Sequence, residues 1–501
     1  MHNIEFLPEE LWYPAVSSYG LQMPYTEESD CVLTLENNPT PNQMQPLLLS
    51  SKGRLIYAAA GFRIRFHCGE IEVTAGDDAD LKFVSGQKDL RGAYLYAVKN
   101  FFAAAPITVA DYLFEYPIYN TWMYAPFEVT AEKVLNYARK IIASGLPEGT
   151  IIIDDKWCDT YGSWQFDRKK FPQPELLLQQ LHALGFKVML WLCPYVSFNT
   201  TAYADCLQKD LLLRRNSEIY SLQWWNESSA CLDLRKREAI EYLRTKLERL
   251  QALGVDGFKF DGGDSMYYLA EHEPDKQSYL WAEFASSYNY NELRAEFNGA
   301  GLNLFERLAD KRHSFGENGV QSLVPAALAL GLGGHPFIAA DMIGGGEIKD
   351  LQSGIKHDRA LFLAHCQIAI LFPNVQFSLL PAEILGTETN RSVLELLDQR
   401  RELWPYLAQL IARARVTKEP VLRLLEYVFP NAGLGKVTNY FMLGDKYLIA
   451  PTDKPNQKEI RLTLPPGKWR YDATVYEGCQ NIVLPADYRH LCILERLSYQ
   501  S

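Results

Sequence analysis

The stretch that decides the fold reads Gly254-Val255-Asp256-Gly257-Phe258-Lys259-Phe260-Asp261-Gly262-Gly263-Asp264. Its apolar run ends in an acid that two glycines follow at once. This pattern predicts a buried parallel strand that carries one carboxylate to the rim of a site. Asp261 is therefore the first candidate for catalysis, although an Asp at this place would also suit the cap of a following helix.

Around this stretch, from residue 113 to 405, strand-like segments alternate with helix-like segments. They predict a fold of the α/β class, a (β/α)₈ TIM barrel with an irregular aromatic insertion near 195–232. The carboxyl ends of barrel strands meet at one face, so we expect one active site there. The predicted strands are 118–124, 150–155, 187–194, the strand that ends at Asp261, 302–305, 313–317, 335–341 and 374–378.

The segments before and after the predicted barrel have a different pattern of polar and apolar residues. Residues 1–112 and 406–501 contain short segments of alternating polarity, separated by turn-forming Asn, Gly and Pro. This is typical of antiparallel strands, and we expect an N-terminal and a C-terminal β-sandwich domain.

The composition excludes several classes of function. A formal net charge of −11 over 501 residues, with no run of basic residues, argues against a nucleic acid partner. The nine cysteines lack CxxC spacing, so we expect neither a disulfide framework nor a zinc ribbon. No His pair has metal-ligand spacing, so we expect no metal. The sequence has no signal-like start and no long apolar run, which predicts a cytoplasmic protein without a membrane partner. It leaves open whether the protein is a homo-oligomer.

Acidic side chains and Trp residues near the ends of the predicted strands favour glycoside hydrolysis. That reaction uses two carboxyl groups, one as nucleophile or base and the other as acid. The candidates are Asp154, Asp155, Asp261, Asp264, Asp310, Glu317 and Asp341.

Four ordered motifs resemble glycoside hydrolase family 31, which contains α-glucosidases, α-xylosidases and α-galactosidases. The first, 258–264, resembles the family's nucleophile motif. The others are 153–157 with 162–172, 230–234, and the segment from His335-Pro336-Phe337 to Asp341-Met342-Ile343-Gly344-Gly345. The resemblance covers about 115–405, and it implies a retaining mechanism in which Asp261 is the nucleophile.

The acid/base is harder to assign from this resemblance. Many members carry it in a Trp-x-Gly-Asp motif, of which this sequence has no intact copy. The nearest match in form is Ser314-Phe315-Gly316-Glu317, so we take Glu317 as the catalytic acid/base. Asp310 is a rival, though it falls before the strand predicted at 313–317. Asp341 is another rival, and the family implies that it lines the pocket or orients the acid.

Further residues are candidates for contact with the substrate. Asp154 and Asp155 point to opposite faces of a strand, and we favour Asp154 for the sugar. Lys259 shares a strand face with Asp261 and either favours its ionised form or makes a structural ion pair. The remaining candidates are Trp157, Trp191, Arg312, His313 and Gln376, and Trp225 is a candidate cover of the site.

Together these features predict a retaining exo-α-glycosidase that needs no cofactor and acts on a small oligosaccharide or glycoside. Resemblance places it nearer the α-galactosidase-like branch, with α-galactoside and α-glucoside both open as substrates. Two alternatives remain: an inactive sugar-binding barrel, and a glycosidase for a modified sugar such as N-acetylgalactosamine or sulfoquinovose.

Overall fold

The computed structural model describes residues 2–77 and 79–497, and within them eight parallel strands close into a barrel. Each strand is short and buried on both faces, as is usual where helices cover a parallel sheet. The expected α/β barrel is confirmed. In chain order its strands are β9 (Ile118–Asn120), β10 (Thr150–Ile153), β11 (Lys187–Leu192), β17 (Gly257–Phe260), β18 (Asn291–Leu293), β19 (Glu306–Arg307), β20 (Ile338–Met342) and β21 (Asn374–Phe377).

Two predicted strands are wrong. Residues 302–305 and 313–317 lie in loops and turns, and the fifth and sixth barrel strands are β18 and β19. Both strands are very short and carry the charged residues Glu292, Glu306 and Arg307, so they lack the apolar pattern of a buried strand. With this shift Asp310, which falls before the strand predicted at 313–317, lies just beyond the end of an observed strand, β19.

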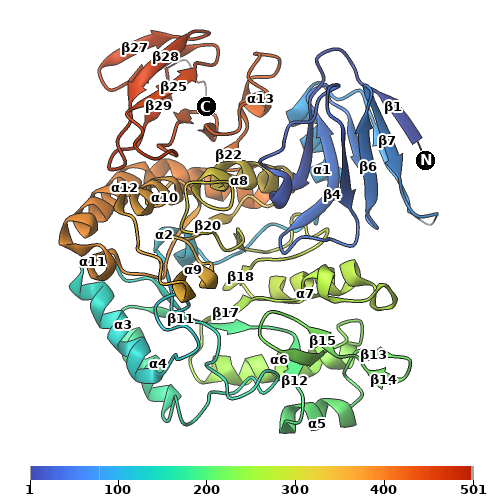
Figure 1. Cartoon of the computed structure of the whole chain (residues 1–501), viewed down its shortest axis with the longest axis vertical. Coiled ribbons are helices and arrows are strands. Elements are labelled where there is room, and N and C mark those ends of the chain that lie inside the picture. The colour runs from blue at the N-terminus through green and yellow to red at the C-terminus, as the bar shows by residue number, and fades with distance from the viewer. Residues whose placement is uncertain (1, 78, 498–501) are drawn as a thin grey trace.

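Helices follow the barrel strands and pack around them (Figure 1). The first begins after Thr130, whose side chain caps it by accepting a hydrogen bond from the Lys133 amide at 3.2 Å. The helices around the barrel include α3 (Ala131–Ala143), α4 (Pro174–Ala183), α6 (Arg237–Ala252), α7 (Pro274–Ser286), α8 (Leu323–Leu332) and α10 (Arg359–Ala369).

The N-terminal domain is a β-sandwich of two four-stranded antiparallel sheets, followed by α1 (Leu90–Asn100). Figure 1 shows it at the same end of the molecule as the C-terminal sheets. The two sheets are β1 (His2–Glu5), β7 (Glu70–Thr74), β6 (Phe62–His67) and β3 (Cys31–Leu35), and β2 (Trp12–Val16), β4 (Met44–Ser50), β5 (Leu55–Tyr57) and β8 (Lys82–Val84).

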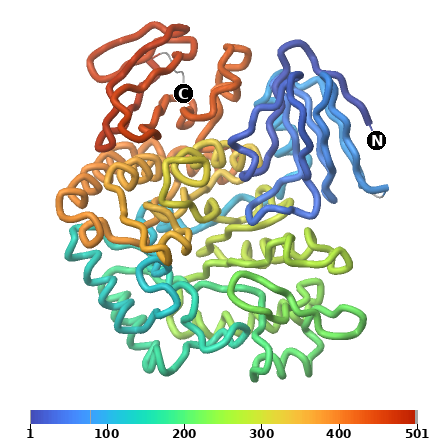
Figure 2. Tube along the Cα trace, in the orientation of Figure 1, coloured from blue at the N-terminus to red at the C-terminus, as the bar shows by residue number. Residues whose placement is uncertain are grey.

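The insertion after β11 forms a small three-stranded sheet of β12 (Tyr195–Ser197), β16 (Ser228–Cys231) and β15 (Leu222–Gln223), with α5 (Thr201–Gln208). Figure 2 shows this segment, in green, at the opposite end of the molecule from the C-terminal domain.

The C-terminal domain pairs a six-stranded sheet with a two-stranded one, as a β-sandwich requires. A single helix, α12 (Gly386–Thr417), leads into it, so residue 405, the expected domain boundary, lies within a helix. The strands are β22 (Leu422–Arg423), β23 (Phe441–Leu443), β24 (Tyr447–Ile449), β29 (Ile493–Arg496), β26 (Lys468–Tyr471) and β27 (Thr474–Glu477), with β25 (Glu459–Thr463) and β28 (Asn481–Pro485).

Candidate active site

Asp261 follows β17 directly and is buried at the carboxyl end of the barrel. Its Oδ2 accepts a hydrogen bond from Trp191 Nε1 at 2.9 Å, and its Oδ1 accepts one from Arg294 Nε at 2.8 Å. Gly262 and Gly263 both have positive φ, of 66° and 73°. A Cβ on Gly263 would lie 2.6 Å from the Trp281 ring, so the chain can turn here only with glycine.

The charge of Asp261 is fixed by its neighbours. Burial alone would raise the pKa of its carboxyl, but the positive charges of Arg294, Lys259 and Arg307 outweigh burial and hold the pKa well below its usual range. Asp261 is therefore ionised near neutral pH, as a nucleophile must be.

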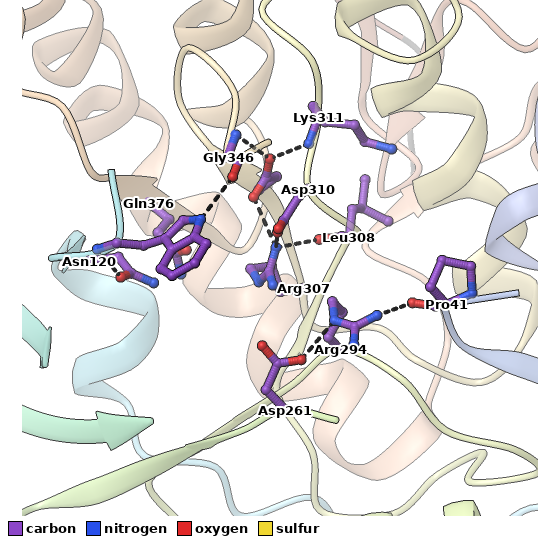
Figure 3. A network of polar contacts seen from close by, with 12 residues as sticks. Pro41, Asn120, Asp261, Arg294, Arg307, Leu308, Asp310, Lys311, Gly346 and Gln376 are labelled. Carbon is purple, nitrogen blue, oxygen red and sulfur yellow. Dashed lines mark hydrogen bonds and ion pairs between the residues drawn. The ribbon is translucent and has the colours of Figure 1, made fainter. Parts of the chain in front are cut away.

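Arg294 is a residue of this site that the sequence did not reveal. It follows β18 and also makes a bidentate ion pair with Asp264, at 3.1 Å for each contact. Its Nη1 donates to the carbonyl of Pro41 in the N-terminal domain (Figure 3). Its guanidinium lies 5.5 Å from the ring centre of Trp225. The signal that would have pointed to Arg294 is its place after a barrel strand, and that strand was not predicted.

The N-terminal domain also reaches the base of β19. Gln43 Nε2 donates to Glu306 Oε2 at 2.8 Å and to the Arg307 carbonyl at 2.9 Å. This domain therefore contacts the Arg294 side chain through Pro41 and the Arg307 backbone through Gln43.

Lys259 and Asp154 form a buried ion pair of 2.7 Å inside the barrel. The carboxyl of Asp155 points elsewhere and accepts hydrogen bonds from Tyr161 Oη at 2.9 Å and from Asn226 Nδ2 at 2.8 Å. Burial raises the pKa of Asp155 to about 6. Asp154 thus belongs to the barrel network and Asp155 anchors the insertion.

We expect Lys259→Met to destabilise the protein by about 3–5 kcal/mol, because it leaves the buried Asp154 carboxylate without its cation. Urea denaturation followed by Trp fluorescence measures this change. Lys187→Met is the matched control: Lys187 pairs with Asp256 at 2.9 Å, but its side chain is 46% exposed. An exposed pair contributes at most about 1 kcal/mol. Equal losses in the two variants would show that burial of the Lys259 pair has no special weight.

Trp157 and Trp191 are both buried, and only Trp191 touches the candidate nucleophile. Trp157 Nε1 donates to the Trp191 carbonyl at 2.7 Å, so it supports Trp191 from behind.

Arg307 lies at the centre of a second group of carboxylates, and Figure 3 shows it beside Asp310. Its Nη1 lies 2.6 Å from Asp310 Oδ1 and 2.9 Å from Asp341 Oδ1, and its Nε lies 3.4 Å from Glu292 Oε1. Gln376, on β21, donates to Glu292 Oε2 at 2.6 Å. Gln376 thus binds one oxygen of the Glu292 carboxyl while Arg307 lies near the other.

Asp341 is the last but one residue of β20, has a φ of 69° and is fully buried. Its Oδ2 accepts hydrogen bonds from the amides of Lys311 at 2.7 Å and Gly346 at 3.2 Å. Burial raises the pKa of Asp341 to about 7, against the opposing charge of Arg307.

Three residues predicted near 312–317 lie outside this group. Glu317 occupies an exposed turn. Arg312 points outward and pairs with Asp350 at 2.6 Å. His313 contacts the Gly344 carbonyl and the Asp358 amide, each at 2.7 Å, so it supports the 344–358 loop. The Arg307-Leu308-Ala309-Asp310 segment keeps the spacing of a Trp-x-Gly-Asp motif, with Arg in place of Trp and Ala in place of Gly, and this spacing is a signal that could have pointed to Asp310.

Within residues 2–77 and 79–497, no cluster of His, Cys, Asp and Glu is arranged to hold a metal ion. The helices described there include none with the length and apolarity to cross a membrane.

Two family models match the chain. Residues 112–313 match the TIM-barrel domain of glycosyl hydrolases family 31, and residues 418–496 match the C-terminal domain of the same family.

Among curated relatives, the myogenesis-regulating glycosidase of Mus musculus is 29% identical over 449 residues, which is 85% of this chain and 62% of that protein. Alpha-xylosidase XylQ of Lactiplantibacillus pentosus is 24% identical, and the match covers 64% of this chain and 44% of that protein. The chain therefore spans less than two thirds of these relatives.

Two solved structures share the fold over 99% of this chain. A dextranase from Flavobacterium johnsoniae, complexed with glucose, has a TM-score of 0.86 at 17% identity, with 66% of that chain covered. A sulfoquinovosidase from E. rectale, complexed with an aza-sugar inhibitor, has a TM-score of 0.86 at 16% identity, with 82% covered.

Proposed function

The chain belongs to glycoside hydrolase family 31, and on that premise we propose that it is a retaining exo-α-glycosidase acting on a terminal α-linked galactose or glucose. The observation that carries the proposal is the arrangement of two carboxylates around two arginines. Asp261 is bound by Arg294, Asp310 is bound by Arg307, and the charges of both arginines act on Asp261. A buried ionised carboxylate beside a second carboxyl is what a retaining mechanism needs.

In this mechanism Asp261 attacks the anomeric carbon while the acid protonates the departing glycosidic oxygen. Water then attacks the covalent glycosyl-enzyme, and the same residue, now a base, takes its proton. We assign the acid/base to Asp310 in place of Glu317. Asp310 is 37% exposed at the end of β19, beside the buried network, whereas Glu317 lies on an outward turn.

The other polar groups would shape the sugar pocket. Trp191 and Arg294 both contact the nucleophile, so they fix its orientation. Asp154 and Lys259 are the neighbouring buried polar groups, and we propose that Asp154 contacts the sugar hydroxyls. We propose that Trp225, which is 45% exposed beside Arg294, covers the bound sugar.

A second candidate is a sugar-binding barrel without catalysis. The specific observation that favours it is Arg307, a cation where many family members carry Trp, next to the proposed acid.

The state of the cysteines and the proposed reaction indicate where the protein works and what it binds. All nine cysteines are free thiols, which supports the cytoplasm as the working compartment, because disulfides are rare there. The expected partner is a small oligosaccharide or glycoside.

A panel of aryl α-glycosides of galactose, glucose, xylose, N-acetylgalactosamine and sulfoquinovose tests the proposal. We expect turnover of the galactoside or the glucoside, with the α-anomer as the first product by proton NMR. A β-anomer as first product contradicts the retaining mechanism. If no glycoside is hydrolysed while calorimetry shows that a sugar binds, the sugar-binding candidate replaces the enzyme.

A further inference from the structure

A cavity of about 740 Å³ lies where the N-terminal domain meets α7, and it shares no residue with the candidate active site. Figure 1 shows α7 below the N-terminal domain. Four segments line the cavity: Asn37 in the N-terminal domain, Phe101 after α1, residues 273–279 on and before α7, and the loop that contains Asn298. Its volume lies in the range of cavities that bind small molecules.

The side-chain amide of Asn298 is held in one orientation at this cavity. The Ala300 amide donates to Gln45 Oε1 at 3.2 Å, so Gln45 Nε2 is the donor to Asn298 Oδ1, at 2.8 Å. Tyr57 Oη donates to the same Oδ1 at 3.2 Å. In the part of the chain that the structure describes, no group accepts a hydrogen bond from Asn298 Nδ2, and this atom is not buried. Asn298 Nδ2 is therefore a hydrogen-bond donor open to a ligand.

Two half-buried aromatic rings, Phe101 and Tyr279, also line the cavity. Phe101 stacks on Tyr57 with ring centroids 4.2 Å apart and an interplanar angle of 13°. Lys276 Nζ lies 5.1 Å from the centre of the Tyr279 ring, and among the described residues no carboxylate pairs with it. The cavity therefore offers flat apolar surfaces next to free N–H donors.

These groups indicate the chemistry of the ligand. The charged side chains of the lining are Glu273, Asp275 and Lys276, so the cavity has no excess of positive charge for an anionic ligand. A wholly apolar ligand would leave Asn298 Nδ2 without a partner. A sugar presents both an apolar face of C–H groups and hydroxyls that accept and donate hydrogen bonds.

We propose that this cavity is a second, non-catalytic binding site for a neutral oligosaccharide. A sugar ring packs against Tyr279 and Phe101, and its hydroxyls accept hydrogen bonds from Asn298 Nδ2 and Lys276 Nζ. The site goes beyond the proposed function, because binding here requires no hydrolysis.

One segment of the N-terminal domain connects this cavity with the active site. The Asp275 carboxylate, at the cavity, accepts hydrogen bonds from the amides of Asn37 at 2.6 Å and Asn38 at 3.0 Å. Pro41, three residues further on, accepts a hydrogen bond from Arg294, which binds the proposed nucleophile. An oligosaccharide bound in the cavity is therefore held near the barrel mouth.

Calorimetric titration of Asp261→Asn with maltotriose and with raffinose tests the inference, since this variant should not consume the sugar. We expect one trisaccharide to bind at two sites per chain. Binding beside Trp191 and Trp225 should change Trp fluorescence, whereas none of the residues described as lining the cavity is a Trp. Adding Tyr279→Ala should weaken the binding that leaves Trp fluorescence unchanged by on the order of tenfold. Adding Lys276→Met should weaken it by about fivefold.

Lys209→Met is the matched control, because Lys209 Nζ lies 4.9 Å from the ring centre of Tyr242, away from this cavity. Its titration should match that of Asp261→Asn alone, and melting curves should show that all variants are folded. The sugar should also slow hydrogen exchange in residues 273–279 and 297–302.

The inference is wrong if calorimetry finds no binding beyond that seen by Trp fluorescence, or if Tyr279→Ala leaves the second binding unchanged. It is also wrong if Lys209→Met weakens that binding as much as Lys276→Met does. The test is separate from that of the proposed function. If no glycoside is hydrolysed and Trp fluorescence does not respond to sugar, calorimetry and hydrogen exchange still decide whether the cavity binds an oligosaccharide.

Discussion

Asp261→Asn is expected to lower kcat/KM by on the order of 10⁴-fold or more on any α-glycoside that the wild type hydrolyses. The amide cannot form the glycosyl-enzyme, and among residues 2–77 and 79–497 no other carboxylate accepts hydrogen bonds from both Trp191 and Arg294. The fold should survive, because Arg294 keeps its bidentate pair with Asp264. Initial rates and a melting curve measure the two effects.

A variant with a shorter side chain, Asp261→Ala, tests the role of Asp261 through the stereochemistry of the product. In Asp261→Ala, azide can enter from the face that the carboxylate left, and we expect a β-glycosyl azide from an activated α-glycoside. Glu317→Gln is the control in the same assay, with activity within about twofold of the wild type, since exposed surface changes are usually mild. If Asp261→Asn keeps more than a few per cent of wild-type activity, Asp261 is not the nucleophile.

Much of this fold could be predicted from the sequence because most barrel strands carry strongly apolar, buried residues. Ile151, Ile152 and Ile153 are examples, and so is Phe258 before the acid Asp261. The same reasoning fails for β18 and β19, whose residues are largely charged or polar. Lys259 and Glu292 are register partners on neighbouring strands, and both point into a network of ion pairs. Hydrophobic periodicity contains no sign of a strand that is buried through its charges.

That failure bears on the choice of the acid, which we propose to be Asp310 in place of Glu317. Because β18 and β19 were not predicted, the expected strand fell at 313–317 and Glu317 stood at its end. Asp310 then appeared to precede a strand, although it follows one. Arg294 and Arg307 were missed for a related reason, since their partners Asp261, Asp264 and Asp341 lie far from them in the chain or on another strand. Tertiary ion pairs of this kind leave no local pattern.

We expect the loss of kcat/KM in Asp310→Asn to depend on the leaving group of the substrate. We expect kcat/KM to fall by about 10²–10⁴-fold on a disaccharide, whose departing alkoxide needs a proton. On an α-glycosyl fluoride the loss should be about tenfold or less, because fluoride departs without general acid help. Glu317→Gln should leave both substrates unaffected. The comparison uses the same two substrates for each variant, so a general loss of folded protein would lower both rates equally.

Azide again separates this role from that of Asp261. In Asp310→Ala the glycosyl-enzyme still forms on Asp261 from a glycosyl fluoride, and azide then attacks it without needing a base. The product should be the α-glycosyl azide, the opposite anomer to that from Asp261→Ala. Two displacements occur at the anomeric carbon, and because each inverts it, the α configuration is retained. If Asp310→Asn loses the same factor on fluoride and disaccharide, Asp310 supports the fold or the sugar and does not supply the proton. If Glu317→Gln shows the leaving-group dependence in its place, an exposed turn must move into the barrel mouth during the reaction, and the acid belongs there.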